Sequence, residues 1–165
     1  MRQQVRRRKG NAMLDVGLIA IPLLGLLFGI FDFGYAIFLR SCLQNSVREG
    51  VRYAVTYQTT NGTTCQDASI TNVVKKSALG FLTPSDKAAT IHVRYYDPTT
   101  FSEIMAPAGN TPGNIVEVSV ENYMYSWMVP LYWSSSPLNI TVRSSDRMEG
   151  LPGGGQPPCR VPANT

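Results

Sequence analysis

The chain has 165 residues, enough for one domain and an additional element, and its formal net charge of +4 comes from 15 Lys+Arg and 11 Asp+Glu. Five of the basic residues lie within the first ten positions, so residues 11–165 hold 10 basic against 11 acidic side chains. This balance excludes a basic nucleic-acid-binding domain, which would need Lys and Arg clustered in its body. What remains is a short basic segment directly before an apolar run, a pattern typical of targeting and membrane-topology signals.

The apolar run predicts a single membrane-spanning helix over residues 16–39. Residues 16–31 carry no charge, and the apolar stretch continues to Leu39 if Asp32 is tolerated. At 1.5 Å per residue, these two lengths cover roughly 24 Å and roughly 36 Å, against a hydrocarbon core of about 30 Å. The basic residues before the run predict a cytoplasmic N-terminus, with everything after Arg40 exported.

The helix is expected to continue beyond the membrane. Apolar residues recur at helical spacing after the span, and no proline interrupts residues 23–83; the recurring residues are Leu39, Leu43, Val47, Val51 and Ala54. We therefore predict one helix of about 45 residues, from near Asn11 to near Tyr57, whose first half is lipid-soluble and whose second half packs on protein. A cleaved secretory signal peptide is the alternative, because Gly34-Tyr35-Ala36 matches a small-x-small cleavage site.

Five residues stand out in the apolar run and at its edges. Pro22 removes one backbone donor, which predicts a mild kink. Gly25 and Gly29 form a small-xxx-small pair that would let another helix approach closely, although glycine is also simply frequent in membrane helices. Asp15 and Asp32 lie 17 residues apart, roughly 26 Å along a helix, so they are expected near the two faces of the hydrocarbon layer. No Lys or Arg lies between Asp15 and Arg40 to pair with them.

The segment from Arg6 to Val55 resembles the N-terminus of the TadE-like minor pseudopilins of the tight-adherence (Tad, or Flp) pilus system. The resemblance rests on a basic leader ending in Gly10, an acidic residue five positions later, the triplet Asp32-Phe33-Gly34 closing a proline-containing apolar helix, and the ending REGVRYA at residues 48–54. The family usually has Glu at the acidic position, often followed by an aromatic residue, where this chain has Asp15 and Val16.

The resemblance implies a processing site and a set of partners. It implies that a prepilin peptidase cuts between Gly10 and Asn11, removing residues 1–10, so that Asp15 becomes the fifth residue of the mature chain. An acidic fifth residue can neutralise the new N-terminal ammonium of its own or a neighbouring subunit in a low-dielectric layer. Other implied partners are other pilins and minor pseudopilins and the inner-membrane assembly platform. The implied location is the inner membrane, with a periplasmic C-terminal domain that can enter an extracellular pilus.

The long helix is predicted to cover residues 11–57. After it, the sequence predicts an exported α+β domain over residues 58–149. Residues 67–82 have the spacing of a short amphipathic helix, and three later segments alternate apolar and polar residues; these are residues 91–96, 116–121 and 138–143. Strands with one polar face predict an antiparallel sheet buried on one side against the two helices, an arrangement like that of pilins. Residues 97–114 are expected to form a long loop, and the Gly/Pro-rich residues 150–165 a tail.

Residues 123–133 hold five aromatic side chains. We interpret them as core and subunit-contact surface, because no basic groove accompanies them as a base-stacking surface would require.

The cysteines and the histidine predict a disulfide and no metal site. In an oxidising compartment, Cys65 and Cys159 are the natural pair, since both lie outside the predicted helices and strands, whereas Cys42 lies on the long helix and is expected to be free. No Cys-x-x-Cys or His-x-x-x-His spacing occurs, and His92 lies alone on a strand. No phosphate loop or catalytic triad motif is present, so neither a cofactor nor an enzymatic activity is predicted.

The leading hypothesis is a membrane-inserted pseudopilin that primes, caps or anchors an adhesive pilus. A single-span anchored periplasmic binding or scaffold domain unrelated to pili is the main alternative, and a secreted enzyme is a third.

Overall fold

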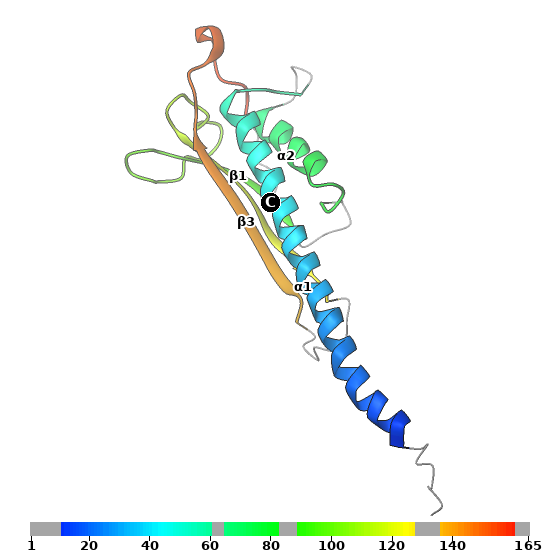
Figure 1. Ribbon diagram of the computed structural model, residues 1–165. Helices are drawn as coiled ribbons and strands as arrows, with labels where there is room; N and C mark the ends of the chain where they lie inside the picture. The colour runs from blue at the N-terminus through cyan, green and yellow to red at the C-terminus, as the bar shows by residue number, and fades with distance from the viewer. Residues whose placement is uncertain (1–10, 61–64, 83–88, 128–135, 161–165) are drawn as a thin grey trace, which may run out of the picture.

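The computed structural model describes residues 11–60, 65–82, 89–127 and 136–160. It contains a 45-residue helix α1 (Asn11–Val55), a shorter helix α2 (Gln66–Ser77), three strands β1 (Thr90–Tyr96), β2 (Ile115–Tyr125) and β3 (Leu138–Arg147), and a 3-10 turn η1 (Pro152–Gly154). The predicted α+β class is therefore confirmed: a long helix and a short helix pack on a small antiparallel sheet. Figure 1 shows that α1 continues well beyond the rest of the domain at its N-terminal end.

The sheet is antiparallel with strand order β1-β2-β3. The register pairs Val93 of β1 with Val118 of β2, and Val120 of β2 with Val142 of β3. It shifts between Val120 and Tyr123, where Asn122 adopts a positive φ of 59°. Such a bulge bends the strand and re-aims the side chains that follow it, here those of the end of β2.

The second half of α1 forms the spine of the core. It packs against α2, β2 and β3, while α2 also contacts β1. The helical residues expected to face protein are all buried, from Leu39 through Ala54. Their partners are the inward-facing residues of the sheet, Val116, Val118, Val120, Ile140 and Val142, together with Ile70 and Val74 of α2. Each helix and strand buries one face, so the apolar residues recur with the period of that element in the sequence.

The two helices approach each other closely at Gly50. A Cβ at this position would lie 2.5 Å from Cγ2 of Val74 and 3.6 Å from Cγ2 of Ile70. Glycine at position 50 therefore lets α2 lie directly against α1.

The short helix ends earlier than predicted. The expected helix over residues 67–82 is Gln66–Ser77, with Ala78 as its C-terminal cap. Leu79 and Gly80 adopt positive φ values of 53° and 86°, a left-handed conformation that cannot continue an α-helix. The apolar spacing extended the predicted helix to Leu82. Leu82 is indeed buried, but it lies in the turn that follows the helix.

Candidate functional site

The N-terminal part of α1 has no protein around it. Every large apolar side chain from Met13 to Phe31 is exposed, with exposed fractions between 43% and 85%. By length and composition, α1 is a candidate membrane span. The 19 residues from Met13 to Phe31 extend roughly 28 Å, close to the thickness of a hydrocarbon core. Ala36 and Leu39, which lie at the end of the predicted span 16–39, are buried against the domain.

The boundary between the uncovered part of α1 and the domain is marked by Asp32. Its side chain is buried, and the hydroxyl of Tyr125 on β2 donates a hydrogen bond to its Oδ1 at 2.5 Å. Burial, together with the neighbouring Asp32 carboxylate, raises the pKa of Tyr125 to about 12, so the phenol stays protonated and able to donate. The sequence placed Asp32 at a membrane face but indicated no partner within the chain.

An aromatic cluster surrounds this boundary. Its members come from α1, from the turn after α2 and from the end of β2: Tyr35, Phe38, Phe81, Tyr125 and Trp127. The rings of Tyr35 and Tyr125 lie 5.8 Å apart between centroids, and those of Tyr125 and Trp127 lie 5.5 Å apart. Tyr and Trp are the residues enriched at membrane–water interfaces, because each combines an apolar ring with a polar atom. Residues 128–133 of the predicted aromatic segment lie outside the described residues.

The other residues singled out in the apolar run are distributed around the uncovered helix. Asp15 and Pro22 are exposed, Gly25 and Gly29 are half-buried, and α1 continues through Pro22. A Cβ at Gly29 would meet no other atom within 4 Å, so this face has room for a neighbouring helix. Asn11 begins α1, and Gly10 lies outside the described residues.

At the opposite end of the domain, the C-terminal segment is joined to the start of α2. A disulfide links Cys65 to Cys159, 94 positions apart, and Cys42 is free. The backbone N–H of Gln66 donates a hydrogen bond to the backbone carbonyl of Cys159, with 2.8 Å between nitrogen and oxygen. The side chain of Asn110 donates both to Oε1 of Gln66 and to the carbonyl of Pro158. The predicted disulfide therefore attaches the Gly/Pro-rich tail to the domain, and these hydrogen bonds, which the sequence did not indicate, add to that attachment.

A buried ion pair reinforces this attachment. Nε of Arg160 lies 3.1 Å from Oδ2 of Asp67, and the two side chains are only 5% and 3% exposed. The Arg160 guanidinium also lies over the ring of Tyr95, 4.1 Å from its centroid, and donates to the carbonyls of Ile104 and Ala108. The Tyr95 hydroxyl donates to Oδ1 of Asp67 at 3.3 Å.

Burial is the main cause of the pKa shifts of Asp67 and Tyr95. Desolvation raises the pKa of Asp67 above its usual value, and the charge and hydrogen bond of Arg160 oppose that rise. Desolvation, with the nearby Asp67 carboxylate, also raises the pKa of Tyr95. Removing either charge would leave the other buried without its ionic partner, which is costly in a protein interior.

The outer face of the sheet carries a second, partly exposed set of charges. Nη1 of Arg94 lies 2.8 Å from Oε1 of Glu121 and 3.7 Å from Glu117. The hydrogen bond from Arg94 lowers the pKa of Glu121. His92 lies on the same face, 3.9 Å from Glu121. Within the described residues, no group of three or more His, Cys, Asp and Glu side chains is arranged to hold a metal ion.

Sequence reasoning did not identify Tyr125, Asp67, Tyr95 or Arg160 as partners. The sequence did contain an indication of the Asp67–Arg160 ion pair, because Asp67 follows Cys65 by two residues and Arg160 directly follows Cys159. Pairing the two cysteines therefore brings the acidic and basic side chains close together.

Comparison with known proteins supports the resemblance found in the sequence. No curated protein and no solved structure gives a significant match. Among protein families, the model described as TadE-like protein matches residues 10–52. The match covers the uncovered part of α1, Asp32 and most of the helical spine of the domain, and the similarity of this N-terminal segment to TadE-like proteins is thereby confirmed.

Proposed function

We propose that this protein is a membrane-anchored minor pseudopilin that takes part in the assembly of a Tad/Flp-type adhesive pilus, by priming, capping or anchoring it. The TadE-like match suggests involvement in the Tad pilus and a structural rather than catalytic role. The observation that carries the proposal is the division of α1 into an uncovered apolar half and a half that forms the core of the domain. A single helix with these two halves would couple a membrane anchor rigidly to an exported domain.

We propose that Val16–Tyr35 lies in the hydrocarbon layer. These 20 residues extend roughly 30 Å, which equals the thickness of that layer. Asp15 would then lie at the cytoplasmic face, and the aromatic cluster around Tyr125 at the periplasmic face. This places Tyr and Trp at the depth where they are favoured, and it leaves Asp32 just inside the layer with Tyr125 as a hydrogen-bond donor. The five basic residues of the leader support a cytoplasmic N-terminus.

A prepilin peptidase would cut between Gly10 and Asn11, and α1 begins at Asn11. The new ammonium would lie about one helical turn from Asp15, whose side chain is exposed and so accessible to its own or a neighbouring subunit's N-terminus. Other pilins, minor pseudopilins and the inner-membrane assembly platform are the expected partners. Gly25 and Gly29 offer a surface where a partner's helix could pack.

Gene deletion with complementation tests the proposal. Cells lacking the chain should lose piliation and surface adhesion, and expression of the full chain should restore both. The protein recovered from peptidase-containing cells should begin at Asn11. Unchanged piliation would contradict the pilus role and support an anchored periplasmic scaffold domain. A retained Met1, or a start at Ile37 after signal-peptide cleavage, would contradict the processing site.

A further inference from the structure

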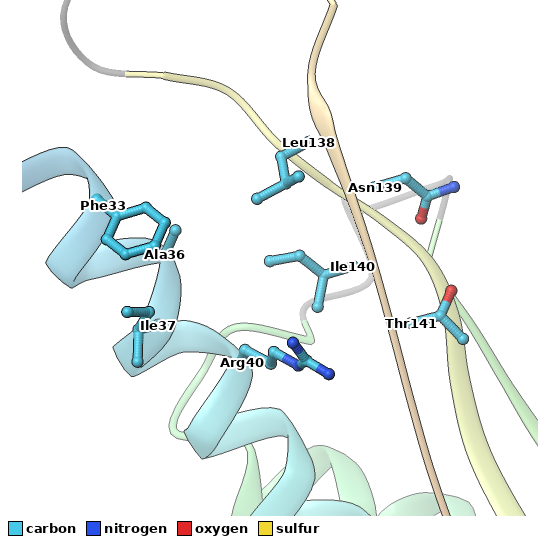
Figure 2. A pocket seen from close by; sticks show the side chains of 8 residues that line it. All are labelled: Phe33, Ala36, Ile37, Arg40, Leu138, Asn139, Ile140 and Thr141. Atoms are coloured by element: carbon cyan, nitrogen blue, oxygen red, sulfur yellow. The ribbon is translucent and has the colours of Figure 1, made fainter. Parts of the chain in front are cut away.

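A groove lies between α1 and the start of β3, beside the aromatic cluster. Eight residues line it, and its volume is about 420 Å³, within the range of roughly 300–1,000 Å³ that ligand pockets occupy; they are Phe33, Ala36, Ile37, Arg40, Leu138, Asn139, Ile140 and Thr141. Figure 2 shows Leu138 and Ile140 pointing toward the helix, while Asn139 and Thr141 point away from it. The inner surface of the groove is therefore apolar.

Arg40 lies at one end of this apolar surface. It follows Phe33 and Ile37 along the same side of α1, and Figure 2 shows its guanidinium extending toward β3. Among the described residues it makes no ion pair, whereas Arg52 on the same helix lies 3.9 Å from Glu49. The groove thus combines an apolar wall with a cation that has no acidic partner in the part of the chain that the structure describes.

The depth of the groove in the membrane follows from the proposed function, on which this step rests. With Tyr35 at the edge of the hydrocarbon layer, Phe33 lies inside that edge and Ile37 just outside it. Arg40 lies five residues beyond Tyr35, roughly 7.5 Å farther along the helix. The headgroup region extends about 5–8 Å beyond the hydrocarbon on each side, so Arg40 reaches the level of the lipid phosphates.

We propose that this groove binds one anionic phospholipid of the periplasmic leaflet, with an acyl chain that leaves the hydrocarbon layer along Phe33 and contacts Ile37 and Leu138, and with the phosphate on Arg40. Charge complementarity favours this occupant over a second copy of the chain. The apolar part of another copy's α1 carries no carboxylate between Asp15 and Asp32, so it would cover the groove without neutralising Arg40. A lipid supplies both the apolar chain and the anion in one molecule.

Photolabelling of the full chain in lipid nanodiscs tests the proposal. The discs consist of phosphatidylcholine with a trace of one of two probe lipids. The anionic probe is phosphatidylglycerol and the zwitterionic probe is phosphatidylcholine, each with a photoactivatable group in its acyl chain. We expect the anionic probe to label peptides containing Ile37 or Leu138 at least threefold more than the zwitterionic probe does. Arg40→Gln should abolish this preference, whereas Arg48→Gln, at an exposed position outside the groove, should leave it unchanged. Ile37→Trp should lower labelling by both probes by filling the groove.

Equal labelling by the two probes, or an unchanged preference in Arg40→Gln, would overturn the proposal. A photoreactive amino acid at position 37 tests the other occupant, because covalent dimers formed through it would assign the groove to a second copy. Failure of the chain to insert into the discs would overturn both the lipid site and the proposed anchor. Normal insertion without lipid selectivity would overturn the lipid site alone and leave the pilus role to the deletion experiment.

Discussion

The hydroxyl of Tyr125 and the carboxylate of Asp32 are joined by a 2.5 Å hydrogen bond that links the end of β2 to α1 where the helix leaves the domain. Both residues are buried, at 6% and 4% exposed. The bond satisfies a buried carboxylate and fixes the end of the sheet against the helix. In the proposed membrane orientation, it would also set the angle at which the exported domain stands on its anchor.

Tyr125→Phe should lower the free energy of unfolding of the domain by about 1–3 kcal/mol, because Asp32 loses this donor while remaining buried. Urea unfolding of the full chain in one detergent, followed by near-ultraviolet circular dichroism, measures the effect. Tyr35→Phe is the matched control, since its ring belongs to the same cluster but its hydroxyl makes no hydrogen bond in the described structure. Equal losses in the two variants would show that the Asp32 bond contributes little.

Arg160→Gln should destabilise the domain by about 3–5 kcal/mol at neutral pH, because it leaves Asp67 buried without its cation. Arg143→Gln is a suitable control at an exposed position. Chemical unfolding at pH 7 gives the difference directly. A loss below about 1 kcal/mol would indicate that the pair behaves like an exposed one.

The cost of Arg160→Gln should also depend on pH. In the wild-type chain the pKa of Asp67 is raised, so its contribution to stability is largest below the unfolded pKa of 3.8 and is lost as pH rises through the folded pKa. Without Arg160 the folded pKa rises further, which strengthens this trend. The stability gap between variant and wild type should therefore narrow as the solution is acidified. A gap that stays constant or widens between neutral pH and about pH 4 would contradict this.

Reduction of the disulfide should destabilise the domain without freeing the C-terminal segment completely. A closed loop of this length contributes about 4–5 kcal/mol in the chain-entropy model. The Asp67–Arg160 pair still holds the segment, so limited proteolysis near Cys159 should accelerate far more in reduced Arg160→Gln than in either single perturbation. Full cleavage on reduction alone would show that the ion pair does not hold the segment.

Gly50→Ala should be destabilising although alanine favours helices. The new methyl group would lie 2.5 Å from Cγ2 of Val74, and overpacking of a core costs typically 1–3 kcal/mol against a gain in helix propensity of about 1 kcal/mol. Gly34→Ala in the same helix meets no atom within 4 Å and should not lower stability. Thermal unfolding of the two variants compares them. An unchanged melting temperature for Gly50→Ala would mean that α2 shifts to admit the methyl group.

Asp15→Ala should impair pilus assembly more than membrane insertion, because apolar length and leader charge direct insertion while the carboxylate is proposed to pair with an N-terminal ammonium. Asp15→Glu keeps the charge and should assemble normally. Counting surface pili alongside carbonate-resistant membrane protein separates the two effects. Equal loss of insertion and assembly would refute the pairing role.

The helices and strands of this protein, and the face that each one buries, could be predicted from the amino-acid sequence. The long helix, the three strands and the buried side of each follow from apolar periods of 3.6 and 2, which are local properties of the chain. Basic residues before an apolar run and two cysteines outside regular structure were readable in the same way. The end of α2 was predicted too late, although Gly80, which adopts a left-handed conformation, is a residue type that commonly ends a helix.

The pairing of the buried polar groups depends on the folded chain. Asp32 and Tyr125 are 93 positions apart and no local pattern relates them, whereas Asp67 and Arg160, also 93 positions apart, are related in the sequence only through the neighbouring cysteines. Their pairing follows from the packing of α1 and α2 on the sheet, which removes these groups from water and makes a specific partner necessary. The same packing leaves the first half of α1 uncovered and forms the groove at Arg40. The candidate membrane span could thus be read from composition, whereas its junction with the rest of the domain required the fold.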